Sequence, residues 1–350
     1  MDSVTVFEDT QLGLRPCYFV EGSDVFVPSI AGLFARRLTH TPKADEKGVR
    51  QFFDRQPDGF HTCFSGVRKV PLHHALRKRG HMLALVERRD FASVPRTPLL
   101  TLIEDALRRI LSAHRKPALA LSGGLDSALL LALCRRMGAD IPIVTLATDF
   151  PGYCEREITL ATAKALGASD VEAIEASAED FVAALPDAIA ACETPLYNLH
   201  PVSRWLLARE LTARGFTAIV TGDGADQVFA GSDPRNYMPI VGAMVQAAGI
   251  TLESPFLDEP VIASARAYGV DADKSALRRA AEEILPDEIV RRPKQPRLAP
   301  GFDVSEYRES AADCHLHELL GVSPPPKDAG FANTLWVTAT LLFQHLGGLA

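Results

Sequence analysis

Cysteine pairs at the spacing of a metal or redox motif are missing from this sequence. Six cysteines are scattered through 350 residues, and no two of them form a CxxC pair. Zinc ribbons and dithiol oxidoreductases depend on such pairs, so neither class is indicated. In a chain of this size we interpret the six as reduced, buried thiols of a cytoplasmic protein. They are Cys17, Cys63, Cys134, Cys154, Cys192 and Cys314.

Long apolar runs and an excess of positive charge are missing as well. The longest apolar window, LWVTATLLF at residues 335–343, is too short to cross a bilayer. The first ten residues show neither the basic nor the apolar region of a signal peptide. The formal net charge of −7 argues against a nucleic-acid binder held by phosphate contacts. We therefore expect a soluble protein with neither a membrane nor a nucleic acid as partner.

Two kinds of pattern divide the chain. Residues 1–95 alternate short apolar segments with Gly- and Pro-containing turns, which is typical of an antiparallel sheet with a few short helices. After a linker at 92–98, strand-like runs alternate with helical segments, a pattern that calls for a parallel sheet covered on both faces. We predict a small α+β domain at 1–95 and an α/β domain with a doubly wound parallel sheet at 96–350, mainly helical from about residue 230.

The segment SGGLDS, residues 122–127, falls between a predicted strand and a predicted helix. Doubly wound proteins bind ligands at this edge of the sheet. Two glycines let backbone N–H groups approach a polyanion, and the helix N-terminus adds positive partial charge. The carboxylate of Asp126 would repel a phosphate, which indicates a Mg²⁺ ion placed between them. The alternative is that these residues only cap the helix.

A second segment, IVTGDGADQVFAG at residues 219–231, has the same strand–turn–helix pattern. It supplies another acidic pair, Asp223 and Asp226, at a strand end. Two acidic turns on adjacent strand ends can face one pyrophosphate and share its metal ions. We therefore predict that Asp126 and Asp226 bind Mg²⁺ together.

These two segments carry a family resemblance. SGGLDS resembles the PP-loop, SGGxDS, of N-type ATP pyrophosphatases, which cleave ATP between the α and β phosphates. The second segment resembles the asparagine synthetase motif SG(D/E)GxDE(L/V)FxGY, with Gln227 for the usual Glu and Ser232 for the common Tyr. The similarity to asparagine synthetases and the related β-lactam synthetases extends to three further segments, ETPLYNLHPVSRWLLAREL (193–211), GITLESPFLDEPVIASA (249–265) and DKSALRRAAEEILPDEIVRRPKQP (273–296).

The resemblance implies a PP-loop ATP-pyrophosphatase fold with ATP and Mg²⁺ as cofactors, and it assigns residues to the site. Asp126 and Asp226 would hold Mg²⁺ on the pyrophosphate, and Lys274 would reach the same group. Lys294 would stabilise charge in the acyl-transfer step. The other contacts implied are Leu121, Ser122, Gly123, Gly124 and Ser127 around the phosphates, Gly222 near the adenosine, and Leu146 or Thr148 near the adenine.

Residues 1–95 resemble the later half of a glutamine amidotransferase domain. Segment 7–38 is similar to RDRFGIKPLYY…FASEIKALL, and segment 63–76 is similar to FxGIRRLPPGHxL. Asparagine synthetases carry a catalytic Cys directly after the initiator Met, whereas Asp2 stands here. The resemblance therefore implies a truncated domain without glutaminase activity, in which Cys17 lies in a strand and is not a nucleophile.

The reaction implied is amide formation by an AMP-forming ligase. A substrate carboxylate takes AMP from ATP with release of pyrophosphate, and an amine then displaces AMP. Without a glutaminase the nitrogen comes from ammonia, from a second substrate or from the same molecule. We expect the last, a lactam closure as in β-lactam synthetase on a specialised biosynthetic substrate. An ammonia- or amine-dependent amide synthetase is the alternative. For the assembly, both a monomer and a homodimer are compatible with the sequence.

A protonated amine needs a base before it can attack. Asp223 is predicted to be that base, helped by Glu253, which stands where the synthetases commonly have Arg. The sequence disfavours two other function classes. PP-loop enzymes of tRNA modification or sulfur transfer usually need paired cysteines and a basic surface, which this sequence lacks. A non-catalytic module is disfavoured because Asp126, Asp226 and Lys294 are all present.

Overall fold

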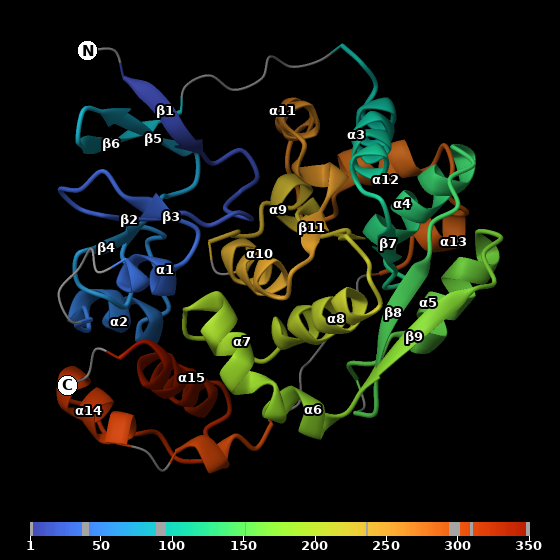
Figure 1. Ribbon diagram of the computed structural model, residues 1–350. Coiled ribbons are helices and arrows are strands. Elements are labelled where there is room, and N and C mark those ends of the chain that lie inside the picture. The colour runs from blue at the N-terminus through green and yellow to red at the C-terminus, as the bar shows by residue number, and fades with distance from the viewer. Residues whose placement is uncertain are drawn as a thin grey trace.

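The structure, a computed structural model, describes residues 3–36, 42–88, 96–150, 152–235, 237–293, 302–308 and 311–347. In these ranges the first part of the chain forms two antiparallel sheets of three strands each, and the second forms one sheet of five parallel strands. Figure 1 shows the small sheets at one end of the molecule and the parallel sheet at the other. The strands are β1 (Val4–Glu8), β2 (Tyr18–Val20), β3 (Phe26–Val27), β4 (Val67–Lys69), β5 (His74–Arg79), β6 (Met82–Glu87), β7 (Pro117–Ala120), β8 (Ile143–Thr148), β9 (Val171–Ala176), β10 (Ala218–Val220) and β11 (Thr251–Glu253).

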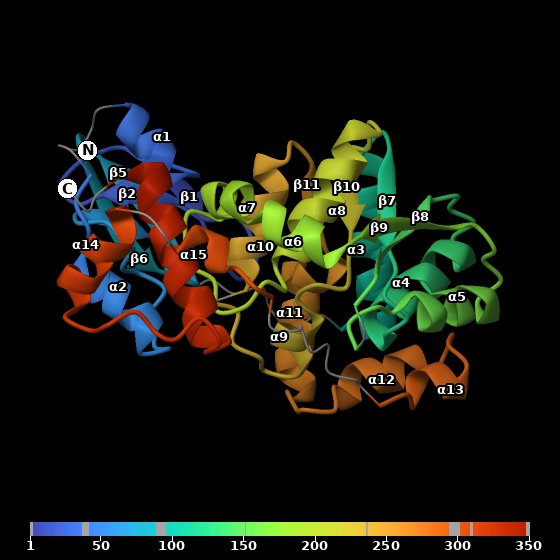
Figure 2. The ribbon, with the colours of Figure 1, turned by 90° about the horizontal axis from the view of Figure 1, so that it is seen from below.

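Helices cover both faces of the parallel sheet, whose strand order is β11-β10-β7-β8-β9. Helices α4 and α5 lie on one side and α8 and α10 on the other (Figures 1 and 2), which confirms the predicted doubly wound sheet. The helices are α1 (Ile30–Ala35), α2 (Glu46–Phe53), α3 (Leu99–Ala113), α4 (Leu125–Arg136), α5 (Arg156–Ala165), α6 (Ala178–Ala183), α7 (Leu185–Cys192), α8 (Val202–Ala213), α9 (Ala225–Phe229), α10 (Met238–Ala247), α11 (Glu259–Tyr268), α12 (Ser275–Ala281), α13 (Asp287–Val290), α14 (Ala311–Leu320) and α15 (Phe331–Leu346), with 3-10 turns η1 (Pro255–Leu257) and η2 (Ser305–Tyr307).

The central strands of the parallel sheet are buried on both faces, which explains their apolar sequences. Leu119 of β7 pairs with Ile143 of β8 on one side and with Val220 of β10 on the other. Leu119 and Val220 are fully buried. Because the strands are parallel, the turns after β7, β8 and β10 meet at one edge of the sheet.

The structure differs from the sequence pattern at three places. The helical spacing over 178–192 predicts one helix, whereas the structure has two, α6 and α7, because Pro186 has no N–H to continue the ladder and stands in the first turn of α7. The apolar pattern at 59–67 predicts a strand, but only Val67 belongs to one, β4, and the rest forms isolated bridges such as His61 with Arg68. The short strand β11 was not foreseen, since its three residues show no clear alternation.

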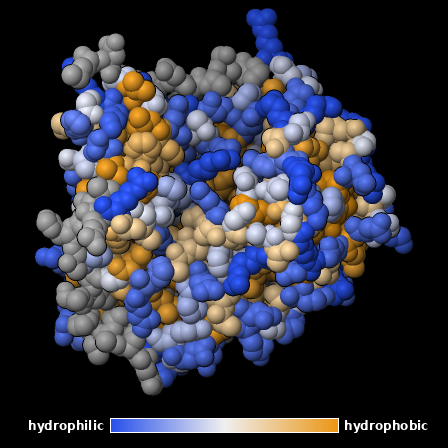
Figure 3. Space-filling model, viewed as in Figure 1, coloured by the Kyte–Doolittle hydropathy of each residue, from blue (hydrophilic) through white to orange (hydrophobic). Residues whose placement is uncertain are grey.

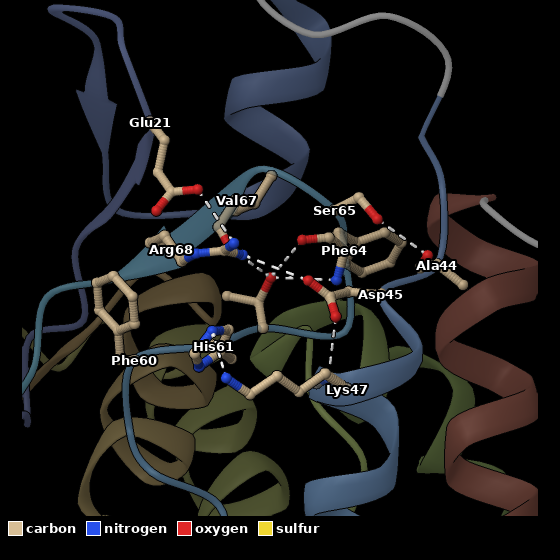
Figure 4. A network of polar contacts seen from close by, with 12 residues as sticks. Glu21, Ala44, Asp45, Lys47, Phe60, His61, Phe64, Ser65, Val67 and Arg68 are labelled. Carbon is tan, nitrogen blue, oxygen red and sulfur yellow. Dashed lines mark hydrogen bonds and ion pairs between the residues drawn. The ribbon is translucent and has the colours of Figure 1, made fainter. Parts of the chain in front are cut away.

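A polar network lies inside the N-terminal part of the chain (Figure 4). Arg68, on β4, pairs with Glu21 at 3.0 Å and with Asp45 at 3.4 Å. The same guanidinium lies 5.7 Å from the centre of the Phe60 ring. The carboxylate of Asp45 also accepts a hydrogen bond from the N–H of Gly48 and so caps α2. These groups join β4 to α2 and to the turn after β2, which is a structural task.

Apolar packing crosses the boundary predicted at residue 95. One cluster surrounds the parallel sheet, and a second joins Ile30 and Phe64 of the N-terminal part to Phe181 and Trp336 of the later part. Helix α14 contacts α2, and α15 contacts α7, so the last two helices lie beside the N-terminal part (Figure 2). On the face drawn in Figure 3, apolar patches are separated by hydrophilic residues. Within the described ranges, no helix is both long and apolar enough to traverse a bilayer.

Glu193 connects the two parts and gives a pH-dependent prediction. Its buried carboxylate, just after α7, accepts hydrogen bonds from the N–H groups of Ile30 and Ala31 (2.7 Å for Ala31) at the start of α1. Burial raises the pKa of Glu193 from 4.5 to about 7, although the two N–H groups act in the opposite direction.

We expect the folded protein to lose stability as the pH rises from 4.5 towards 7 because of this group. In that window the native carboxyl keeps a proton that the unfolded chain releases, so unfolding is favoured as the pH rises. The loss amounts to at most about 3 kcal/mol. About 2 kcal/mol of this loss falls between pH 5.5 and pH 8, where urea unfolding measures it, and in Glu193→Gln the difference between these pH values shrinks by that amount. An unchanged difference in the variant would show that another group causes it.

Candidate functional site

The first turn of the site, residues 121–124, joins β7 to α4. Its backbone begins on the sheet, where the N–H of Leu121 donates to the carbonyl of Val144 at 2.9 Å. Gly123 has a φ of 71°, and a Cβ there would lie 2.9 Å from the backbone carbonyl carbon of Ile158. Only glycine fits this position. Gly124 is the N-cap of α4, so backbone N–H groups of the helix start face the end of β7.

Two hydroxyls and one guanidinium fix this turn. The Oγ atoms of Ser122 and Ser127 are 3.1 Å apart, and the N–H of Ser122 donates to Ser127 Oγ at 3.1 Å. From outside the turn, Nη1 of Arg292 donates to the carbonyl of Gly123 at 2.7 Å and to Thr162 Oγ1 at 2.8 Å. Sequence reasoning missed Arg292, although it lies in the segment RRPKQP that was singled out.

The second turn, residues 221–224, joins β10 to α9 and touches the first. A Cβ on Gly222 would lie 2.8 Å from the Cβ of Asp126 and 3.3 Å from the N of Ser127. Gly222 therefore permits the two turns to approach each other. Gly224, with a φ of 94°, is the N-cap of α9, so Asp226 lies in the first turn of that helix.

Asp126 and Asp226 converge on one ammonium group, that of Lys274. Nζ of Lys274 lies 2.8 and 2.7 Å from the two carboxylate oxygens of Asp126 and 2.8 Å from Oδ1 of Asp226. The lysine side chain is only 9% exposed, against 23% for Asp126 and 33% for Asp226. Burial by itself would lower the pKa of Lys274, but the two carboxylates outweigh it and the pKa is raised.

This pair of carboxylates fits the magnesium site that the sequence predicts. The ammonium between them shows that the position favours a cation. No group of three or more His, Cys, Asp or Glu side chains that could hold a metal ion occurs within the described ranges. Mg²⁺ needs no such cage, since it is commonly held by one or two carboxylates, water and substrate phosphates. Asp126 and Asp226 are therefore the residues that would hold it.

Asp223 does not have the environment of a base, which corrects that prediction. Arg204, on α8, binds its carboxylate through Nε (2.9 Å) and Nη2 (3.1 Å), and the hydroxyl of Tyr237 donates to it at 3.0 Å. Burial would raise the pKa of Asp223, but Arg204 and these hydrogen bonds lower it below the usual value. A carboxylate so stabilised is a poor proton acceptor. Neither Arg204 nor Tyr237 was predicted, because local pattern does not reveal pairing across elements.

Glu253 does not assist Asp223 either. Its carboxylate contacts His114 at 3.0 Å and Arg15 at 3.5 Å. In the part of the chain that the structure describes, no contact joins the side chains of Glu253 and Asp223. The structure therefore gives no support to the prediction that these two act together as a base.

The end of β8 is the region predicted to contact adenine. Leu146 is half-buried and packs against both apolar clusters, which identifies it as a core residue. Thr148 is the last residue of β8, and its Oγ1 is buried without a hydrogen-bond partner within the described residues. Its N–H donates to Sγ of Cys154 at 3.4 Å, and this thiol is exposed, which corrects the expectation that all six cysteines are buried. Thr148 thus has a polar atom at this edge that a bound base could engage.

The sequence also led to expectations about Lys294 and Cys17. Lys294 lies outside the described residues. Cys17 is buried directly before β2, and burial raises the pKa of its thiol to about 12. A thiol with this pKa is protonated at neutral pH, which agrees with the expectation that Cys17 is no nucleophile.

The chain matches a known protein family and is similar to curated proteins and to solved structures. The asparagine synthase family profile matches residues 99–243 and 242–341. A putative glutamine-hydrolyzing asparagine synthetase of Mycobacterium bovis is 29% identical over 183 residues, which are 49% of this chain and 28% of that protein. The glutamine-hydrolyzing asparagine synthetase of Gallus gallus is 25% identical over 337 residues, covering 81% of this chain and 58% of the relative. The chain thus spans between about a quarter and three fifths of the length of these curated relatives. Among solved structures, NMN synthetase from Francisella tularensis matches with a TM-score of 0.34 and 17% identity, over 68% of this chain and 90% of that one.

Proposed function

Because the chain belongs to the asparagine synthase family, we propose that it is an ATP-dependent carbon–nitrogen ligase that activates a substrate carboxylate as its adenylate. The observation that carries the proposal is the convergence of Asp126 and Asp226 on one point beside two glycine turns. A triphosphate bound there would have backbone N–H groups on one side and a cation site on the other.

Each residue of the site has a task in this reaction. The turn at 121–124 and the hydroxyl of Ser122 would bind phosphate oxygens. Asp126 and Asp226 would hold Mg²⁺, which when bound neutralises charge on the leaving pyrophosphate. The substrate carboxylate oxygen attacks the α-phosphorus, pyrophosphate leaves, and the resulting acyl-adenylate has AMP as its leaving group.

The buried set of Asp223, Arg204 and Tyr237 has a positioning task. The bidentate Arg–carboxylate contact holds the second turn at Asp223, apart from the contact of Lys274 with Asp226. Because Asp223 lies between Gly222 and Gly224, it determines where Gly222 meets Asp126. This set therefore keeps the two turns at a fixed position relative to each other while substrates bind and leave.

For the second step we propose that the amine belongs to the same molecule, so that AMP leaves as a lactam ring closes and the ammonium proton goes to solvent. The support for this version is the resemblance of the segment RRPKQP, residues 291–296, to β-lactam synthetases. An internal amine also gives a high effective concentration at the acyl carbon. In the alternative version, ammonia or a separate amine forms an open-chain amide.

The test is carboxylate-dependent exchange of labelled pyrophosphate into ATP, followed by mass spectrometry of the products. A panel of amino-carboxylates is offered with and without added ammonia. Exchange that requires a carboxylate supports the ligase, and a product lighter than its substrate by one water without added amine supports ring closure. Failure of every carboxylate to support exchange, together with no binding of Mg²⁺-ATP, would remove the proposal.

Cys154 reports on nucleotide binding at the end of β8. Since this exposed thiol lies against the N–H of Thr148, adenine bound there is expected to cover it. Labelling of Cys154 with N-ethylmaleimide should slow several-fold in the presence of Mg²⁺-ATP, as followed by peptide mass spectrometry. An equal labelling rate at saturating ATP would show that adenine binds elsewhere.

A further inference from the structure

The ammonium of Lys274 stands where a metal ion shared by Asp126 and Asp226 would have to bind. It is within 2.8 Å of three of their four carboxylate oxygens. We propose that Lys274 couples metal binding to nucleotide binding: its ammonium holds the two carboxylates until the phosphates of ATP draw it away, so that the metal ion binds tightly only together with the nucleotide. The inference rests on the proposed nucleotide site.

Metal and ammonium exclude each other at this point for geometric and electrostatic reasons. Mg²⁺ binds carboxylate oxygens at about 2.0–2.1 Å, so an ion shared by Asp126 and Asp226 lies in the space that Nζ occupies. A divalent ion also repels an ammonium that is in contact with the same oxygens, and the small exposure of Lys274 weakens screening by water. A metal ion arriving alone therefore competes with Lys274.

The lysine can move its charge without moving its backbone. Lys274 has a left-handed backbone, with a φ of 54°, directly before α12. Its N–H donates to the carbonyl of Asp271 at 2.9 Å, and the carboxylate of Asp271 accepts from the N–H and hydroxyl of Ser275 at 3.1 Å each. The main chain is thus held on both sides of the residue. The four-carbon stem of lysine permits Nζ to reach a new position by rotation alone.

The phosphates of ATP offer the displaced ammonium of Lys274 a new anionic partner. Phosphate oxygens bound at the two glycine turns would lie next to Asp126, because Gly222 brings the second turn into contact with that residue. The ammonium can then pair with a phosphate while the metal ion takes the carboxylates. Since binding free energies are reciprocal, the same coupling makes the nucleotide bind more tightly when metal is present.

The experiment measures free Mn²⁺ by electron paramagnetic resonance with the full chain, with and without a nonhydrolysable ATP analogue. For the unmodified protein we expect Mn²⁺ to bind at least about tenfold more tightly with the analogue than without it. In Lys274→Gln, which removes the charge but keeps donors for the carboxylates, Mn²⁺ alone should bind at least about tenfold more tightly than to the unmodified protein. Lys274→Arg keeps the charge and should behave as the unmodified protein does.

Controls separate this inference from the proposed function. Lys164→Met, at an exposed lysine on α5, should leave Mn²⁺ binding unchanged. Equal affinity of Mn²⁺ alone for Lys274→Gln and the unmodified protein overturns the coupling while leaving nucleotide binding intact. Absence of analogue binding to any form of the protein would instead count against the proposed function. Equal gains in Lys274→Gln and Lys274→Arg would show a disturbed site and not a charge effect, and would also overturn the inference.

Discussion

Replacing Asp126 or Asp226 by Asn is expected to reduce carboxylate-dependent pyrophosphate exchange by about 10³-fold or more. A metal ion that stabilises charge on a phosphoryl group contributes several kcal/mol, and about 4 kcal/mol corresponds to three powers of ten in rate. Each substitution removes one of the two carboxylates that meet at Lys274. We expect the loss to be similar for the two, because both belong to one metal site.

The measurement is the exchange rate at saturating Mg²⁺ and ATP, with Asp140→Asn as the matched control. Asp140 is exposed in the turn before β8, at the opposite edge of the sheet from the site. Thermal unfolding of all three variants shows whether they are folded. Exchange at the unmodified rate in folded Asp126→Asn or Asp226→Asn would refute the metal assignment.

Arg204→Met is expected to destabilise the protein by about 3 kcal/mol or more, because it leaves the carboxylate of Asp223 buried without its cation. The side chain of Asp223 is 8% exposed and that of Arg204 is 18% exposed. Tyr237 and the backbone of the turn cannot replace two charge-assisted hydrogen bonds. The pKa of Asp223, now below its usual value, should rise in this variant because burial then acts without the guanidinium.

A double-mutant cycle decides whether the Arg204–Asp223 ion pair, or only the packing of the arginine side chain, stabilises the protein. Urea unfolding is compared for Arg204→Met, Asp223→Asn and the double variant. We expect the double variant to be more stable than the sum of the single losses allows, because it contains no unpaired buried charge. Additive losses would mean that Arg204 and Asp223 contribute separately, and the positioning role of the pair would be contradicted.

Much of the parallel sheet could be predicted from the sequence for a simple physical reason. Strands buried on both faces are short apolar runs, and the turns that follow them must carry Gly wherever the backbone takes a positive φ or approaches another chain segment. Gly123 and Gly222 meet these conditions in the structure. The position of Asp126 and Asp226 at one edge of the parallel sheet could be predicted from the parallel order of the strands alone.

The pairing of Lys274 with the two carboxylates, and of Arg204 with Asp223, could not be predicted from the strand pattern. Lys274 is 148 positions from Asp126 along the chain, and Arg204 is 19 positions from Asp223. Neither separation leaves a periodic signal, because the contacts depend on how helices pack against the sheet edge. For this reason Asp223 looked like a base, and Glu253 like its helper, before their neighbours were known.

The central claim, that the turns carrying Asp126 and Asp226 hold one metal-loaded triphosphate, is tested most directly by a crystal structure with Mn²⁺ and a nonhydrolysable ATP analogue. Anomalous diffraction locates the manganese. The account predicts a peak in coordination contact with both carboxylates and with the phosphates, and with the ammonium of Lys274 displaced from its place between Asp126 and Asp226. A nucleotide bound without metal at these residues, or bound away from the two glycine turns, would contradict it.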